Sequence, residues 1–188
     1  MSEKCCSSSC GCECGPESGS GLGSERGARR LEIELLFLDV EVCERCKGTD
    51  GSLEEAISAV ADVLAATGTV VVLTKTHVTT EEQAREAGLV TSPTIRVNGV
   101  DIQLGAKETL CESCGDLCGE DVDCRVWTYK GEEYTVPPKG MIIDAILKEV
   151  YSGAASAAPV ERSGAEVPEN LKRFFAARAE KDGSGGCC

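Results

Sequence analysis

Alternation of apolar stretches and turn residues predicts one α/β domain over residues 31–152. Residues 31–40 and 69–73 are rich in Leu, Ile and Val, which predicts two buried strands. Between these strands, residues 52–67 carry apolar positions at helical spacing. Because the first four of them, Ser-Leu-Glu-Glu, have the form of a capping box, this helix is predicted to begin at Ser52.

The second half of the domain is predicted to contain a short helix, two hairpins and a final amphipathic helix. Thr-Glu-Glu-Gln at residues 80–83 begins the short helix, and Asn98-Gly99 is a strong signal for a two-residue hairpin turn. The predicted elements are a helix over 80–88, strands over 94–97 and 100–104, strands over 125–129 and 133–136, and a helix over 141–150.

Composition divides the rest of the chain into flexible and structured segments. Stretches of Gly, Ser and Cys without an apolar pattern cannot offset the entropy lost on ordering. The predicted segments are a flexible Cys-rich tail at 1–30, the domain at 31–152 with a Cys-rich insertion at 105–124, a linker at 153–167, a short helix at 168–181 and a flexible Cys-Cys tail at 182–188.

Charge and composition narrow the range of functions. The chain has a net charge of −13 and no cluster of basic residues that could bind the phosphate backbone of a nucleic acid. We therefore expect no nucleic-acid partner. It has neither an N-terminal apolar h-region nor a long apolar run, so we expect a cytoplasmic protein without membrane association. The sequence contains 13 cysteines and one histidine, His77. Any metal site must therefore consist almost entirely of sulfur ligands, which select soft or borderline ions.

A C-x-x-C motif, Cys43 and Cys46, follows the first predicted strand. This spacing places two sulfurs close enough to form one disulfide or to hold one soft metal ion. Further along, Ser92-Pro93 precedes a short apolar strand, where a cis peptide can hold backbone beside those sulfurs. Two functions remain open for this pair. In an oxidoreductase, Cys43 would attack a disulfide and Cys46 would resolve the mixed disulfide. In a metal-binding protein, the two thiolates would instead bind and exchange a metal ion.

The order of predicted elements, together with Cys43, Cys46 and Pro93, resembles the thioredoxin and glutaredoxin class. It is most similar to an uncharacterised thioredoxin-like family with a Cys-rich insertion before the last helix. The resemblance implies a thioredoxin-like mixed four-stranded sheet with flanking helices, to which the insertion and one hairpin are added. It also implies catalytic roles for Cys43, Cys46 and Pro93. One departure is that residues 47–51 separate the motif from the predicted helix start, whereas the thioredoxin helix starts at its first cysteine.

The insertion carries four cysteines in the pattern C-x2-C-x3-C-x5-C, namely Cys111, Cys114, Cys118 and Cys124. Four thiolates at this spacing can surround one tetrahedral ion such as zinc. Acidic residues outnumber basic ones in this segment, so we expect it to owe its order to a bound ion or to disulfides. Both alternatives remain open from the sequence.

The remaining cysteines lie in the two tails. They are Cys5, Cys6, Cys10, Cys12, Cys14, Cys187 and Cys188. A flexible terminal Cys-Cys pair is similar to those of mercuric reductases and arsenical-handling proteins, and that resemblance implies capture of a metal ion and its transfer inward. Flexible tails raise the effective concentration of a donor thiol at an acceptor thiol.

The sequence therefore predicts thiol-based binding and transfer of soft metal or metalloid ions, for detoxification or trafficking. Mercury and arsenic are the first candidate cargoes, with copper after them, and zinc is the candidate resident ion. All 13 cysteines are candidate ligands. A metal-handling or thiol-reducing protein is the expected partner. The alternative is a thiol-disulfide oxidoreductase or metalloid reductase that uses Cys43 and Cys46.

Overall fold

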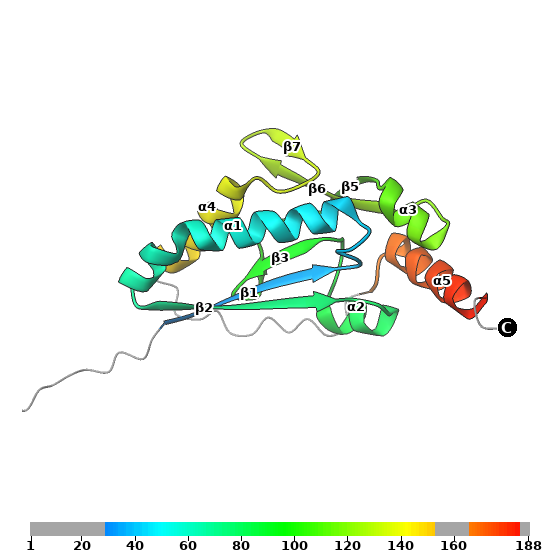
Figure 1. The fold of residues 1–188 in the computed structure, drawn as a ribbon, viewed down its shortest axis with the longest axis horizontal. Coiled ribbons are helices and arrows are strands. Elements are labelled where there is room, and N and C mark those ends of the chain that lie inside the picture. The colour runs from blue at the N-terminus through cyan, green and yellow to red at the C-terminus, as the bar shows by residue number, and fades with distance from the viewer. Residues whose placement is uncertain (1–28, 153–165, 185–188) are drawn as a thin grey trace, which may run out of the picture.

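A computed structural model describes residues 29–152 and 166–184 of the 188-residue chain. Its centre is a four-stranded mixed sheet in the order β2-β1-β3-β4 (Figure 1). The strands are β1 Arg29–Phe37, β2 Thr69–His77, β3 Thr94–Val97 and β4 Val100–Asp101. β1 is parallel to β2 and antiparallel to β3, and β3 is antiparallel to β4. The predicted fold class, a mixed four-stranded α/β sheet with flanking helices, is confirmed.

The predicted start of the first helix is wrong. Helix α1 spans Glu44–Ala66 and has Cys43 as its N-cap, so the C-x-x-C motif forms its first turn. Ser52 lies inside the helix, where its hydroxyl donates to the carbonyl of Pro137 at 2.6 Å. Cys46 and Thr49 are fully buried, and with the buried Leu53 they extend the apolar face of the helix toward its N-terminus. This buried face outweighs the local capping signal at Ser52.

The predicted start of the short helix at Thr80 is confirmed. Helix α2, Glu81–Ala87, is capped by the Thr80 hydroxyl, which accepts from the Gln83 amide, and the Gln83 side chain accepts from the Thr79 amide. The helix ends at Gly88, which has a positive φ of 58°.

The insertion is more ordered than its composition suggested. It contributes strand β5, Lys107–Leu110, and helix α3, Glu112–Cys118, and it leads into β6, Asp123–Tyr129. β5, β6 and β7, Glu132–Tyr134, form a second, antiparallel sheet above α1 (Figure 1). Val122 is fully buried, so the segment includes a residue of the hydrophobic core.

Two further helices complete the described structure. Helix α4, Lys139–Tyr151, packs on α1. Helix α5, Glu169–Ser184, packs on α3 at the other end of the sheet (Figure 1). Three apolar side chains of α5 are buried in this packing: Leu171, Phe174 and Phe175. None of the helices that the structure describes has the length and apolar character needed to cross a bilayer.

Two glycines in α1 allow the packing of this helix to be tested. A Cβ atom on Gly48 would lie 2.6 Å from Val136 Cγ2, whereas a Cβ atom on Gly51 would meet no atom within 4 Å. We predict that Gly51→Ala stabilises the protein by about 0.5–1 kcal/mol, because alanine favours the helix. Gly48→Ala is predicted to destabilise it by about 1–3 kcal/mol through overpacking.

Urea denaturation under reducing conditions measures both effects. Val136→Ala, introduced together with Gly48→Ala, should recover most of the lost stability because it removes the clashing methyl groups. Equal stabilisation by Gly48→Ala and Gly51→Ala would contradict the close approach of α1 to Val136.

Candidate metal centre

Four cysteine sulfurs lie together where the insertion covers the N-terminus of α1. The Sγ atoms of Cys43, Cys111, Cys114 and Cys124 are all within 4.8 Å of one another, and all four residues are buried. The Cys43 and Cys111 sulfurs are 3.9 Å apart, and the Cys114 and Cys124 sulfurs are 3.2 Å apart. Four sulfurs at about 2.3 Å from a zinc ion form a tetrahedron with edges of about 3.8 Å. This group of thiols, the four-cysteine cluster, therefore has the size needed to hold one metal ion.

The cluster consists of free thiols. None of its cysteines forms a disulfide, and the distances of 3.9 and 3.2 Å are well beyond the S–S bond length of about 2.05 Å. The donor set fits a soft or borderline ion such as zinc, because four thiolates can complete a tetrahedral shell without a water molecule.

Two helix N-termini and one strand position the four sulfurs. Cys43 is the N-cap of α1 and Cys111 is the N-cap of α3. Cys114 is in the first turn of α3, and Cys124 is the second residue of β6. The amide of Cys111 donates to the carbonyl of Val122 at 2.8 Å, which closes the insertion and brings its cysteines together.

Arg45, between the two cysteines of the C-x-x-C motif, fastens the insertion to α1. Its guanidinium group donates to three backbone carbonyls of the second sheet, those of Thr109, Leu110 and Cys124, at 3.2, 2.7 and 3.0 Å. It also donates to the Thr109 hydroxyl at 3.0 Å. Arg45 therefore holds the edge of the insertion directly beside Cys43.

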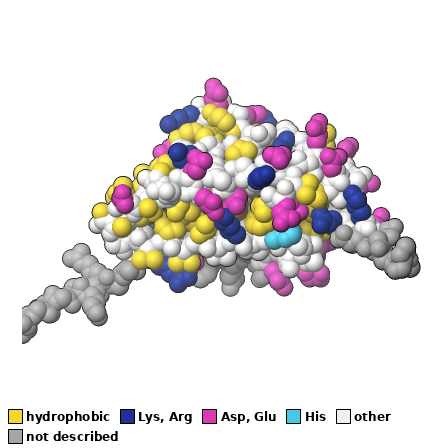
Figure 2. Space-filling model, in the orientation of Figure 1, with side chains coloured by type: hydrophobic (Ala, Val, Ile, Leu, Met, Phe, Trp, Pro, Cys, Tyr) yellow, Lys and Arg dark blue, Asp and Glu magenta, His cyan; other side chains and the backbone are white. Residues whose placement is uncertain are grey.

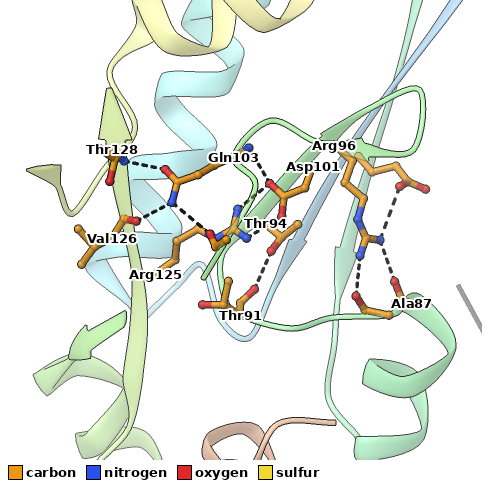
Figure 3. A network of polar contacts seen from close by, with 12 residues as sticks. Ala87, Thr91, Thr94, Arg96, Asp101, Gln103, Arg125, Val126 and Thr128 are labelled. Carbon is orange, nitrogen blue, oxygen red and sulfur yellow. Dashed lines mark hydrogen bonds and ion pairs between the residues drawn. The ribbon is translucent and has the colours of Figure 1, made fainter. Parts of the chain in front are cut away.

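Strand β6 is joined to β4 and the following loop through side chains (Figure 3). Arg125 donates two hydrogen bonds to the Asp101 carboxylate, at 2.7 and 2.6 Å. The Gln103 side chain donates to the Val126 carbonyl and accepts from the Thr128 amide, at 3.0 and 2.6 Å. These contacts make the two sheets one framework around the cluster.

The loop that contains Pro93 lies beside the second cysteine of the motif. The Ser92-Pro93 peptide is cis, and Cys46 Sγ is 3.7 Å from Ser92 Oγ. The Ser92 carbonyl accepts a hydrogen bond from the Arg125 amide at 2.8 Å. The carbonyl group before Pro93 is therefore already bonded to β6. Cys46 thus lies beside the loop that contains Pro93, and β6 is hydrogen-bonded to that loop.

The grouping of cysteines differs from the one expected from the sequence. The spacing of the insertion suggested Cys118 as the fourth ligand of the metal site, but the fourth cysteine of the cluster is Cys43. Cys118 Sγ lies instead beside the carbonyls of Cys114 and Glu120, at 3.4 and 3.6 Å, in the last turn of α3. Because α3 is helical, Cys118 is one turn away from Cys114 along the helix axis, and its thiol is directed back to the helix backbone.

Residues 31–146 of the chain match the family described as Domain of unknown function (DUF2703). The chain belongs to this family. No curated protein and no solved structure matches the chain significantly. The part that matches DUF2703 contains all six cysteines of the described residues, and it ends before α5. The family description assigns neither a fold nor an activity.

Hydrogen bonds among the thiols of the four-cysteine cluster lower the pKa of two of its cysteines and raise the pKa of the other two. Bonds from Cys111 first, and then from Cys114 and Cys124, lower the pKa of Cys43 well below that of a free cysteine. The bond from Cys114 lowers the pKa of Cys111 to about 7. Bonds to Cys111 raise the pKa of Cys114 and of Cys124. The bond with Cys43, and after it burial, raises the pKa of Cys46.

An acidic pocket opens beside the cluster. Its volume is about 570 Å³, and Cys111 is part of its wall. Four carboxylates surround it: Glu112, Asp116, Glu120 and Asp121. Acidic side chains also predominate on the face shown in Figure 2, where Lys and Arg lie singly among them. A cleft of one sign raises the local concentration of oppositely charged ions, so this pocket attracts cations toward Cys111.

The seven tail cysteines fall outside the described residues. They are Cys5, Cys6, Cys10, Cys12, Cys14, Cys187 and Cys188. Their roles remain predictions. For binding experiments on the cluster alone, we define the tail-Ser protein as the full-length chain with serine at these seven positions.

Two matched substitutions in the tail-Ser protein test which cysteines bind the ion. We predict that Cys43→Ser weakens zinc binding by more than about 100-fold, since loss of an outer-shell partner alone typically costs about 10–100-fold. Cys118→Ser should change the affinity by less than about threefold, because its sulfur lies outside the cluster. Competition with a chromophoric chelator measures both values. A large loss with Cys118→Ser and none with Cys43→Ser would contradict the grouping.

Proton release on zinc binding should depend on pH. At pH 8, Cys114 and Cys124 carry protons, so binding should release about two protons. At pH 6, Cys111 is also largely protonated because its pKa is about 7, and release should rise to about three. Protons compete with the ion, so affinity should fall as the pH falls. Calorimetry of the tail-Ser protein in buffers of different ionisation enthalpy measures this number. Release that does not change between these pH values would contradict the assignment.

Proposed function

We propose that this protein binds a soft metal or metalloid ion at the four-cysteine cluster and passes it on by thiolate exchange, in detoxification or trafficking. The observation that carries the proposal is the group of four buried free thiols within 4.8 Å of one another. The group contains neither a carboxylate nor an imidazole. Such a site favours soft thiophilic ions over magnesium, calcium or manganese.

Mercury(II) and arsenic(III) are the first proposed cargoes. Arsenic(III) forms three bonds to sulfur in a pyramidal arrangement, and the insertion alone supplies three thiols in Cys111, Cys114 and Cys124. Zinc prefers four sulfur ligands, so it also needs Cys43. The cluster could therefore hold either zinc on all four cysteines or arsenic on the three from the insertion, as alternative occupants of one site.

Spare thiols next to the ligands support exchange over permanent storage. The Cys46 thiol is hydrogen-bonded with that of Cys43, and the sulfur of Cys118 contacts the backbone of Cys114. The acidic pocket gives cations a route to Cys111, and the tails supply further thiols. An ion held by thiolates moves when an incoming thiolate replaces a bound one, and nearby thiols accelerate this replacement.

The proposed setting is the cytoplasm, where the thiols stay reduced. The proposed partner is a metal-handling or thiol-reducing protein that exchanges ions or electrons with the tails. An oxidoreductase would need Cys43 free to attack a disulfide. Cys43 is fully buried beneath the insertion and lies among three other thiols, which favours the carrier function.

Transfer is tested by the double substitution Cys187→Ser with Cys188→Ser in the otherwise native full-length chain. We predict that this change slows mercury(II) or arsenite transfer onto the cluster by at least about tenfold, because it removes a tethered donor. The equilibrium affinity of the cluster should be unchanged. Stopped-flow measurement of transfer from a labelled dithiol donor gives the rate.

Disulfide reduction by the same proteins separates carrier from enzyme. Cys43→Ser serves as the variant that disables the C-x-x-C motif, with Cys118→Ser as its matched cysteine control. Unchanged metal transfer in the tail variant, together with rapid disulfide turnover that requires Cys43, would replace the carrier proposal by the oxidoreductase alternative.

A further inference from the structure

Cys43 belongs to two groups of thiols at once. Its sulfur is part of the four-cysteine cluster, where it lies 3.9 Å from Cys111 Sγ. It is also the first cysteine of the C-x-x-C motif, and the amide of Cys46 is 3.5 Å from its sulfur. Cys46 itself is outside the cluster, and its sulfur lies beside Ser92 Oγ.

We propose that a metal ion in the cluster and a Cys43–Cys46 disulfide exclude each other, so that oxidation of this pair switches the ion affinity of the site. This inference rests on the proposed ion-binding function. A sulfur in a disulfide has lost the negative charge with which a thiolate ligand binds an ion. Formation of the disulfide would therefore leave only Cys111, Cys114 and Cys124 as ligands.

The geometry of α1 suits this pairing. Cys43 is the N-cap and Cys46 is the third residue of the helix, so the Cys43 side chain folds back over the first turn toward Cys46. Residues three apart at a helix start lie on one face, at a separation that a disulfide can bridge. Both side chains are fully buried, and Cys43 lies against the three insertion cysteines. Oxidation therefore requires the insertion to lift, and an ion that ties Cys43 to three insertion cysteines opposes this movement.

The oxidant that we propose is a low-molecular-weight disulfide, RSSR. The Cys43 thiolate attacks one sulfur of RSSR, a Cys43–SR bond forms, and the first RS⁻ leaves with the electron pair of the broken bond. The Cys46 thiol loses its proton to solvent, its thiolate attacks the Cys43 sulfur, and the second RS⁻ leaves. Two protein thiols are thus oxidised to one disulfide, and one RSSR is reduced to two RSH.

Linkage makes the effect reciprocal. If the disulfide weakens ion binding by a given factor, then the ion disfavours formation of the disulfide by the same factor. An ion-loaded protein would be protected from oxidation, and an ion-free protein would be open to it. The cluster would then hold its ion under reducing conditions and release it when small disulfides accumulate.

The test uses the tail-Ser protein, oxidised glutathione as RSSR and zinc as the ion. Peptide mapping should find a Cys43–Cys46 disulfide and two equivalents of reduced glutathione released per chain. We expect zinc affinity to fall by at least about 100-fold after oxidation, and to return on reduction. Prior loading with zinc should slow disulfide formation by at least about tenfold, because a Cys43 thiolate bound to the ion is not free to attack RSSR.

Two variants make the test specific. Cys46→Ser should bind zinc normally when reduced. On oxidation it should trap glutathione on Cys43 and release one equivalent of reduced glutathione in place of two. Cys118→Ser should behave like the unsubstituted tail-Ser protein throughout.

Three results would overturn the inference: mapping of a Cys114–Cys124 disulfide in place of Cys43–Cys46, unchanged zinc affinity of a protein with the mapped Cys43–Cys46 disulfide, or equal oxidation rates with and without zinc. In each case the reduced protein would still bind zinc. Failure of the reduced protein to bind zinc or arsenite would instead overturn the proposed function.

Discussion

The convergence of four thiols on the N-terminus of α1 is the constraint on which the rest of the site depends. Three of the thiols belong to the insertion, and the fourth, Cys43, belongs to the central domain. A bound ion would therefore connect two parts of the chain that are separated in sequence by strands β2, β3 and β4. A divalent cation would offset part of the negative charge that four clustered thiolates would carry.

Polar contacts position this convergence before any ion binds. Arg45 holds the edge of the second sheet, and the ion pair between Arg125 and Asp101 joins that sheet to β4. The side chain of Arg125 is only 2% exposed and that of Asp101 is 24% exposed, so this ion pair is largely shielded from solvent. A buried pair of this kind fixes geometry more surely than it adds stability. The insertion is thus held over the C-x-x-C motif by directional bonds, and the acidic pocket gives cations access from outside.

Local sequence signals predicted most of the central sheet, the helix that begins after Thr80 and the turn at Asn98-Gly99. Each of these features depends on neighbouring residues. The start of α1 was not predictable in the same way, because it depends on burial of Cys46 and Thr49 against distant parts of the chain.

The membership of the cluster is equally non-local. Spacing alone groups Cys118 with the other cysteines of the insertion, but helical geometry directs its thiol back to the α3 backbone. Cys43 takes its place only because Arg45 and β6 bring the insertion onto α1. The arginine within the C-x-x-C motif was the one available signal that this motif binds another segment of the chain.

X-ray absorption spectroscopy of the zinc-loaded tail-Ser protein tests the central claim most directly, because it reports the atoms bound to the ion. We expect four sulfur neighbours at about 2.3 Å. In Cys43→Ser one sulfur should be replaced by an oxygen or nitrogen neighbour, whereas Cys118→Ser should keep all four. Four sulfur neighbours in Cys43→Ser, with the loss of one in Cys118→Ser, would show that the ion is bound by a different set of cysteines.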